Sequence, residues 1–187
     1  MSNAVSALNG ASSNGYVTVA ERGLVGMVTL RGDLASKELN DAVKSVTGQE
    51  VPAQRAIVHG DMSVAWMSPD ELLIVCDHAK ADQVVSDLGA ALKGVHHMAV
   101  NVSDARAVFA ITGEKTREVL AKMAPADVHP DRFGMGEIRR TRLSQVPAAF
   151  WMVSETEATV VCFRSVAEYV FKLMSVNSVA GSEVDAF

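Results

Sequence analysis

Two stretches, Leu30-Arg31-Gly32-Asp33 and Ile111-Thr112-Gly113-Glu114, decide how this chain of 187 residues is expected to fold. Each stretch ends an apolar run with a glycine and an acidic residue, and a leucine follows seven residues after each glycine, at Leu39 and Leu120. An apolar run that stops at a glycine and resumes with helical spacing is typical of a strand followed by a helix. The same strand-to-helix transition therefore occurs twice, 81 residues apart.

The similarity continues through the rest of both halves. A Trp-Met pair comes later in each half, at Trp66-Met67 and Trp151-Met152, followed by a Ser/acid turn and an apolar run ending in Cys76 or Cys162. The offset drifts from 81 to 86 residues, which loop insertions can absorb. This order predicts an α+β fold of duplicated β-α-β-β-β-α halves, with the two cysteines at equivalent core positions rather than reactive sites. Because the identities are few, chance similarity is the alternative.

Hydrophobic periodicity predicts the individual elements. Strands are expected at 26–31, 55–59, 62–67, 72–76, 97–102, 105–111, 138–143, 147–153 and 159–163, and helices near 39–46, 79–93, 116–123 and 166–174. Ser68–Glu71 is a local conflict, because Ser-x-x-Glu is also typical of a helix start. We interpret it as a turn between two strands, since the five apolar residues after it suit a buried strand better than an amphipathic helix.

These elements give expected boundaries. Residues 1–15 are predicted to be a flexible N-terminal tail, 16–95 the first α+β half, 96–177 the second α+β half, and 178–187 a loose C-terminal tail. The first fifteen residues contain no basic segment followed by an apolar run, so they do not have the pattern of a signal peptide.

Composition excludes several classes of function. The chain has 17 basic and 22 acidic residues and a net charge of −5, which argues against a nucleic-acid or anionic-membrane binding protein. No apolar stretch approaches the roughly 18 residues of a membrane span. With only two cysteines and no CxxC motif, we expect a cytoplasmic protein with reduced thiols. A single disulfide between the two cysteines is the alternative.

The short motifs that could carry chemistry are weak. Gly113-Glu114-Lys115-Thr116 follows a strand, but it lacks the GxxxxGK[ST] spacing of a phosphate-binding loop, and Glu114 would repel phosphate. Gly134-Met135-Gly136 leads into a strand rather than a helix, unlike a dinucleotide fingerprint. The five histidines show no HxxxH or HExxH spacing, so no metal site is expected.

The segment from Pro130 to Leu143 concentrates turn residues and positive charge. On a strand, Arg140 and Arg142 would share one face with Ile138, while Arg139 would point to the other face. Two neighbouring arginines can bind a carboxylate or phosphate. An edge strand protected by charge, a partner-docking surface and a small-anion site are the three interpretations that these residues allow.

Several segments together resemble the gamma subunit of heterotetrameric sarcosine oxidase, within the wider aminomethyltransferase-like (glycine-cleavage T-protein-like) superfamily. The resemblance covers roughly residues 25–176, and Thr-Arg-Leu-x-Gln-Val and Arg-Ser-x-Ala-x-Tyr are its most specific motifs. The segments that carry it are 66–74, 102–106, 112–120, 129–130, 141–147 and 163–169. The resemblance implies an aminomethyltransferase-like, folate-binding-type fold with mainly antiparallel sheets packed by helices.

The same resemblance implies a function. The complex oxidatively demethylates sarcosine to glycine, yielding hydrogen peroxide and formaldehyde or 5,10-methylenetetrahydrofolate, with FAD, FMN, NAD and tetrahydrofolate on its larger subunits. This chain would be a structural subunit without catalytic residues or a cofactor of its own, among alpha, beta and delta partners, with alpha the direct contact. The interface expected on this basis consists of Asp131, Arg132, Phe133, Arg139, Arg140 and Arg142.

A folate-dependent aminomethyl or formyl transferase, or a folate-binding regulator, is the alternative function. Either would need a buried acidic residue beside a pterin pocket, for which Asp104 is the candidate. A sensor of small anions or nucleotides that uses the arginine face is a third class.

Overall fold

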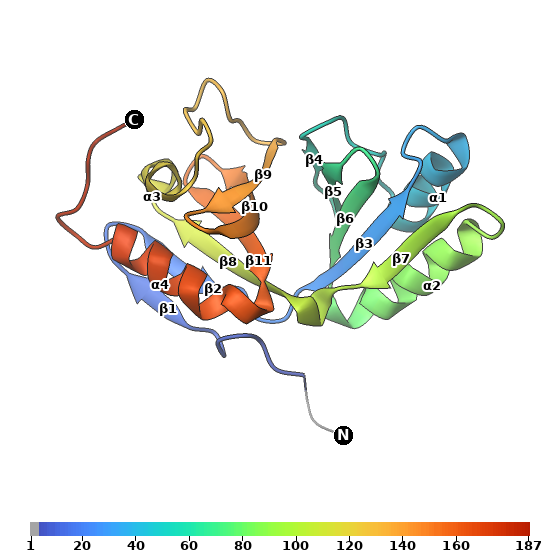
Figure 1. The fold of residues 1–187 in the computed structure, drawn as a ribbon, viewed down its shortest axis with the longest axis horizontal. Coiled ribbons are helices and arrows are strands. Elements are labelled where there is room, and N and C mark those ends of the chain that lie inside the picture. The colour runs from blue at the N-terminus through green and yellow to red at the C-terminus, as the bar shows by residue number, and fades with distance from the viewer. Residues whose placement is uncertain (1–3) are drawn as a thin grey trace. The chain divides into compact units, whose positions relative to one another are not determined.

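The computed structural model describes residues 4–187, which divide into two compact units. The central unit is Val25–Asp104, and the terminal unit joins residues 4–24 to Ala105–Phe187. In Figure 1 the blue N-terminal strands lie beside the yellow strand β8 and the red helix α4 of the terminal unit. The chain therefore leaves the terminal unit after Leu24, builds the central unit without interruption, and returns.

The central unit is a five-stranded sheet with two helices. All neighbouring strands are antiparallel, in the order β4-β5-β6-β3-β7. Its elements are β3 (Gly26–Gly32), α1 (Lys37–Thr47), β4 (Ile57–Val58), β5 (Ser63–Ser68), β6 (Glu71–Cys76), the short 3-10 helix η1 (His78–Lys80), α2 (Ala81–Ala91) and β7 (His97–Asn101).

The terminal unit repeats this plan with one additional strand. Its sheet is also antiparallel between named strands and has the order β1-β2-β8-β11-β10-β9. Its elements are β1 (Ser12–Asn14), β2 (Thr18–Glu21), β8 (Arg106–Thr112), α3 (Thr116–Met123), β9 (Ile138–Leu143), β10 (Val146–Ser154), β11 (Glu157–Phe163), η3 (Arg164–Val166) and α4 (Ala167–Asn177), and η2 (Ser103–Ala105) leads into it.

The helices form where the sequence predicts them. The Ser36 hydroxyl accepts a hydrogen bond from the Leu39 N–H (3.2 Å) at the start of α1, and Gly48 ends the helix with φ 73°. Between these caps, Leu39, Ala42 and Val43 are buried against the sheet. None of the helices in residues 4–187 is long and apolar enough to cross a membrane.

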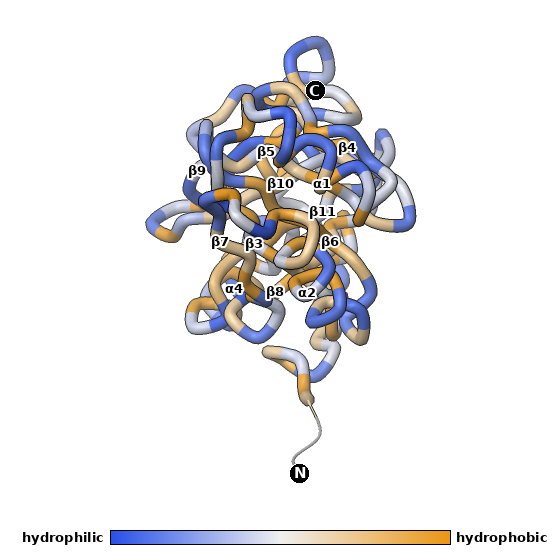
Figure 2. The backbone as a smooth tube through the Cα atoms, turned by 90° about the vertical axis from the view of Figure 1, so that its right-hand side faces the viewer, coloured by the Kyte–Doolittle hydropathy of each residue, from blue (hydrophilic) through white to orange (hydrophobic). Residues whose placement is uncertain are grey.

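The predicted turn at Ser68–Glu71 is confirmed, because β5 and β6 form an antiparallel hairpin around it. Leu72 and Ile74 belong to the apolar core of the central unit, and Leu73, on the opposite face of β6, is also buried. A strand that is buried on both faces explains the unbroken apolar run. Figure 2 shows apolar residues recurring along the strands, while hydrophilic residues mark many of the connecting loops.

The duplication is confirmed by residues that match at a constant offset of 86 between the units. Ala81, Val84 and Leu88 on α2 are buried as Ala167, Val170 and Met174 are on α4. Cys76 and Cys162 follow the same offset, and both are free and buried. Each lies in the apolar core of its unit, and burial raises the pKa of the Cys162 thiol to about 12. The two cysteines are therefore equivalent core residues.

The Trp-Met match is wrong by one residue. Trp66 pairs with Leu72, which faces the core, whereas Trp151 pairs with Thr159, which lies on the other face of its sheet. Met152 is the true counterpart of Trp66, because both hairpins have an irregular register just before the turn. Trp151 therefore stands one position before the equivalent of Trp66, and this single step along the strand places it on the opposite face.

The structure divides the chain differently from the predicted halves 16–95 and 96–177. Strand β7 pairs with β3 in the central unit, and β2 pairs with β8 in the terminal unit. Of the predicted N-terminal tail, residues 1–3 lie outside the described part, and Ser12–Asn14 form β1. In the predicted C-terminal tail, Ser178 is fully buried. Strands that pair across roughly 90 residues of sequence leave no local signal, so hydrophobic periodicity could not show that β1 and β2 belong to the terminal unit.

Val19 tests this division of the chain. Its fully buried side chain belongs to the core of the terminal unit, so Val19→Ala should destabilise that unit by about 1.5–3 kcal/mol. In native-state hydrogen exchange, the amides of β8 and β11 should lose protection while those of β3 and β6 keep it. Loss of protection in β3 and β6 alone would contradict the assignment of residues 4–24 to the terminal unit.

Candidate functional site

Strand β9 forms one edge of the terminal unit's sheet and carries the predicted arginine face. Arg140 lies opposite Ala149 and Arg142 opposite Pro147 on β10, and both arginines are exposed. The core residues Phe150 and Ala148 pair instead with Arg139 and Thr141, so the predicted alternation is confirmed. Within residues 4–187, no ion pair involves Arg142. Both arginines lie on the face of the sheet that points away from its helices.

Phe133 is not available to a partner, contrary to its place in the predicted interface. Its side chain is fully buried and packs edge-on against Phe150, with ring centroids 5.5 Å apart. The guanidinium of Arg139 lies 4.7 Å from the centre of the Phe133 ring. The neighbouring charges suggested a surface segment, but the arginine covers the ring and seals it in the core.

Arg139 also serves the fold more than the surface. Its Nη2 donates to the carbonyl oxygen of Arg132 (2.6 Å), and its Nη1 lies 3.5 Å from the Glu137 carboxylate. These contacts hold the loop before β9 against the strand. Of the predicted interface, the exposed residues are therefore Asp131, Arg132, Arg140 and Arg142.

The sequence reasoning missed one exposed apolar residue in this region. Met135 is 59% exposed and forms a single parallel bridge with Met152 on β10. It stands between Gly134 and Gly136, and Gly136 has a φ of 81°, a conformation that favours glycine. The glycines were read only as a failed nucleotide motif, although they also mark a loop that presents a hydrophobic side chain. We call Arg132, Met135, Arg140 and Arg142 the β9 surface.

A second group of polar residues is buried at the start of α3. The Thr116 hydroxyl contacts the carbonyl oxygens of Gly113 (2.8 Å) and Thr156 (3.1 Å). Arg117 donates to the carbonyl oxygens of Val128 (3.1 Å) and Phe133 (2.6 Å). The rejected phosphate-loop motif is thus a structural turn in which the Thr116 hydroxyl binds the protein's own backbone.

The buried Glu118 and the partly buried Lys122 form an ion pair one turn apart on the same helix, 3.2 Å between Oε1 and Nζ. The Glu118 carboxylate also accepts the N–H groups of Val184 (2.8 Å) and Asp185 (3.0 Å). Burial alone would raise the pKa of Glu118, but the Val184 N–H and the Lys122 ammonium outweigh it and hold this pKa below the ordinary value.

Lys122 completes this cluster. Its ammonium donates to the carbonyl oxygen of Ser182 (2.6 Å) and contacts the hydroxyl of Tyr16 (2.9 Å) and the carbonyl oxygen of Asn177 (3.3 Å). The pair therefore connects α3 to the N-terminal segment, to the end of α4 and to residues 182–185. The predicted loose C-terminal tail is held by these contacts.

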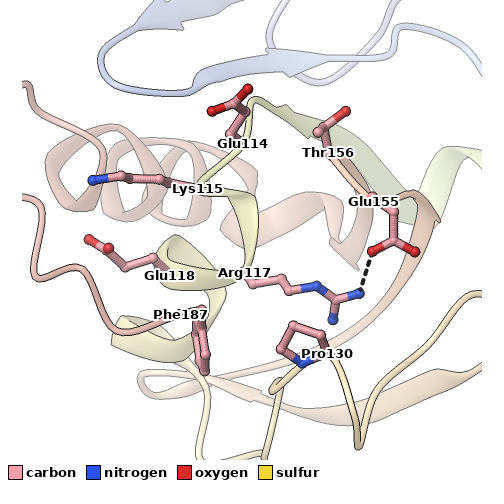
Figure 3. A pocket seen from close by; sticks show the side chains of 8 residues that line it. All are labelled: Glu114, Lys115, Arg117, Glu118, Pro130, Glu155, Thr156 and Phe187. Atoms are coloured by element: carbon pink, nitrogen blue, oxygen red, sulfur yellow. Dashed lines mark ion pairs between the residues drawn. The ribbon is translucent and has the colours of Figure 1, made fainter.

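A pocket of about 270 Å³ lies beside this cluster (Figure 3). In Figure 3 the Arg117 side chain points toward Glu155, with which it forms an ion pair at 3.5 Å. Three carboxylates face two cations, and both Arg117 and Glu118 are already engaged by the protein. The lining residues are Glu114, Lys115, Arg117, Glu118, Pro130, Glu155, Thr156 and Phe187. This charge balance does not suit a phosphate or a folate carboxylate.

The residues proposed for folate or metal binding do not form a site. Asp104 lies in η2 and is exposed, so it does not provide the buried acid that a pterin pocket would require. Across residues 4–187, no three His, Cys, Asp or Glu side chains come together as metal ligands. Glu21 is a buried acid, but it accepts from the Leu8 N–H (2.9 Å) and the Gly10 N–H (2.7 Å) and thereby organises the N-terminal loop.

Comparison with known proteins gives a consistent result. A model of the "Sarcosine oxidase, gamma subunit family" matches residues 31–180. Sarcosine oxidase subunit gamma from Corynebacterium sp. (strain U-96) is 32% identical over 117 residues, which are 61% of this chain and 56% of that protein. The Arthrobacter sp. protein of the same name is 31% identical over 61% of this chain and 57% of its own. The chain thus spans little more than half the length of these curated relatives.

Solved structures agree with the sequence comparisons. A chain of the heterotetrameric sarcosine oxidase from Corynebacterium sp. U-96, in complex with pyrrole 2-carboxylate, is 28% identical with a TM-score of 0.78, covering 90% of each chain. Aminomethyltransferase T of the glycine cleavage system from Bartonella henselae is 13% identical with a TM-score of 0.63 over 90% of this chain and 48% of that one. The second likeness concerns the fold alone.

The burial of Phe133 gives a direct test. Phe133→Ala should lower the free energy of unfolding by about 3–5 kcal/mol, because it empties a fully packed site next to Phe150. Arg132→Ala, one residue away but exposed, should change it by less than about 0.5 kcal/mol. Urea denaturation of both variants measures the difference, and equal stabilities would show that Phe133 is a surface residue.

The Glu118–Lys122 pair predicts a pH dependence. Glu118→Gln leaves the partly buried Lys122 without its counter-charge and should cost about 3 kcal/mol at pH 7. Because the pKa of folded Glu118 is depressed, its stabilisation is present above the ordinary glutamate value of 4.5 and is lost as the pH falls toward the folded pKa. The difference between wild type and variant should therefore shrink below pH 4.5.

Unfolding curves from pH 7 to pH 3 measure this trend, with the exposed Glu38→Gln as the matched control. A stability difference that stays constant over this range would rule out an ionised Glu118 as the source of the effect.

Proposed function

Because this chain belongs to the sarcosine oxidase gamma subunit family, we propose that it is an accessory subunit of a heterotetrameric sarcosine oxidase. The observation that carries the proposal is the likeness to a chain of that heterotetramer over 90% of both chains, with a TM-score of 0.78. The complex would oxidatively demethylate sarcosine to glycine. Alpha, beta and delta subunits would supply FAD, FMN, NAD and tetrahydrofolate binding, and this chain would contribute structure.

The state of its buried polar groups supports a non-catalytic role. Catalytic acids and bases need a polar group that can reach a substrate in a cleft. Here the buried side chains of Thr116, Arg117 and Glu118 are engaged by the protein's own backbone or by ion pairs. Glu71 is likewise bound to Arg31 (2.7 Å). These groups stabilise the fold of their own units.

The β9 surface is the docking site in this proposal. This surface combines three exposed arginines with an exposed methionine, so its charge is opposite in sign to the chain's net charge of −5. Arginine and methionine are enriched in the cores of protein interfaces, and the guanidinium group binds carboxylates in two-pronged fashion. We therefore assign an acidic patch on the alpha subunit as its partner, in a cytoplasmic complex.

Charge reversal tests this assignment. Arg140→Glu combined with Arg142→Glu should weaken assembly about 10- to 100-fold, because it replaces attraction to an acidic patch by repulsion. Arg55→Glu combined with Lys80→Glu changes the net charge equally at exposed positions of the central unit and serves as the control. The yield of complex after co-expression with alpha, beta and delta candidates, followed by size exclusion, measures the effect.

Both variants should unfold at the wild-type temperature, since the substituted side chains are exposed. Undiminished yield with the β9 variant would remove the docking surface. A wild-type chain that never joins the complex would remove the proposed function itself.

A further inference from the structure

The two sheets have four edges, and three of them carry features that block pairing with another chain. β1 has three residues and β4 has two, too few for an extended ladder. β9 has six residues, but three of them are arginines. Short strands and charged side chains are the ordinary means by which proteins protect sheet edges.

Strand β7 is the exception. It has five residues, His97-Met98-Ala99-Val100-Asn101, without Lys, Arg, Asp, Glu or Pro. Met98 is 44% exposed and Val100 is 41% exposed, and the two side chains share one face. An uncharged edge with two exposed apolar side chains is the arrangement that invites a further strand.

The hydrogen-bond pattern shows which backbone groups are offered at this edge. The Val102 N–H donates to the carbonyl oxygen of Met27 (2.8 Å), which places Val102 in a bonded pair with β3. Because bonding alternates along an antiparallel pair, the N–H groups of Met98 and Val100 also point toward β3. Those of His97, Ala99 and Asn101 therefore point to the open edge.

In the terminal unit, the edge that corresponds to the open edge of β7 is already paired with another strand. β2 pairs with β8 as β7 pairs with β3, and β1 covers the outer side of β2 in antiparallel register. Thr18 on β2 is the counterpart of Met98, since they pair with the equivalent residues Thr112 and Arg31. Val19 is fully buried in the core of its unit, whereas its counterpart Ala99 is only partly buried.

We propose that β7 is a second docking edge, which accepts an extended segment of a larger partner subunit in antiparallel register. The segment is uncharged and has apolar side chains at alternate positions, matching Met98 and Val100. This inference rests on the proposed assembly into a complex. A second copy of this chain fits less well, because five residues per copy would be the whole contact and are far fewer than the roughly 20–30 residues per side of a stable interface, whereas in the complex the β7 edge adds to the β9 surface.

A proline substitution tests whether an outward backbone N–H of β7 contributes to assembly, without disturbing the fold of the isolated chain. Ala99→Pro removes an outward N–H and is compatible with an edge strand, so the isolated chain should keep its fold. Its assembly with alpha, beta and delta candidates should be at least about tenfold weaker. Ala99→Ser keeps the N–H at the same position and should assemble like wild type.

Hydrogen exchange provides the second measurement. On assembly, the amides of His97, Ala99 and Asn101 should exchange at least about tenfold more slowly than in the isolated chain, because a partner strand would accept their hydrogen bonds. The amides of Met98 and Val100 should be protected in both states, as they already bond to β3.

The outcomes are distinct. Normal assembly of Ala99→Pro with unprotected outward amides would overturn the β7 edge while leaving the proposed function intact. An isolated chain that dimerises and protects these amides would identify a second copy as the occupant and overturn the partner segment. Failure of the wild-type chain to assemble would instead count against the proposed function.

Discussion

The terminal unit depends on one largely buried ion pair, Glu118 with Lys122 on α3. Burying two opposite charges is costly unless hydrogen bonds satisfy their remaining donors and acceptors. Here those partners come from segments far apart in the sequence: Tyr16, the end of α4 and residues 182–185. The pair therefore holds the segment around Tyr16 and residues 182–185 against α3.

The duplication shows how such a pair is accommodated. With the offset of 81 residues that relates the two strand-to-helix transitions, Glu118 and Lys122 correspond to Lys37 and Asp41 on α1. Those two residues also form an ion pair, but with the charges reversed and both side chains exposed. The helix position is the same in both units. Only the terminal unit has additional segments that cover it, so only there does the ion pair become part of the interior.

Sequence periodicity was sufficient for the elements that fold locally. The helix ending at Gly48 and the hairpin at Ser68–Glu71 follow from caps, turns and apolar runs, and the structure has both. It was insufficient where a contact joins distant segments or where a similar residue stands at a non-equivalent position. The pairing of β2 with β8, the one-residue difference between the positions of Trp66 and Trp151, and the arginine that covers Phe133 are all of this kind. For the candidate site, the alternation of Arg140 and Arg142 was readable, whereas Met135 was recognisable only after its loop had been placed.

The discontinuity of the terminal unit has a consequence during synthesis. Strand β2 leaves the ribosome early, but its partner β8 follows about 90 residues later, which corresponds to roughly 5–20 s at ordinary elongation rates. The central unit is continuous in sequence, so it can fold before the N-terminal segment has β8 to pair with. A nascent chain would thus hold one finished unit preceded by strands β1 and β2, and the side of β2 that pairs with β8 would stay open until β8 is made.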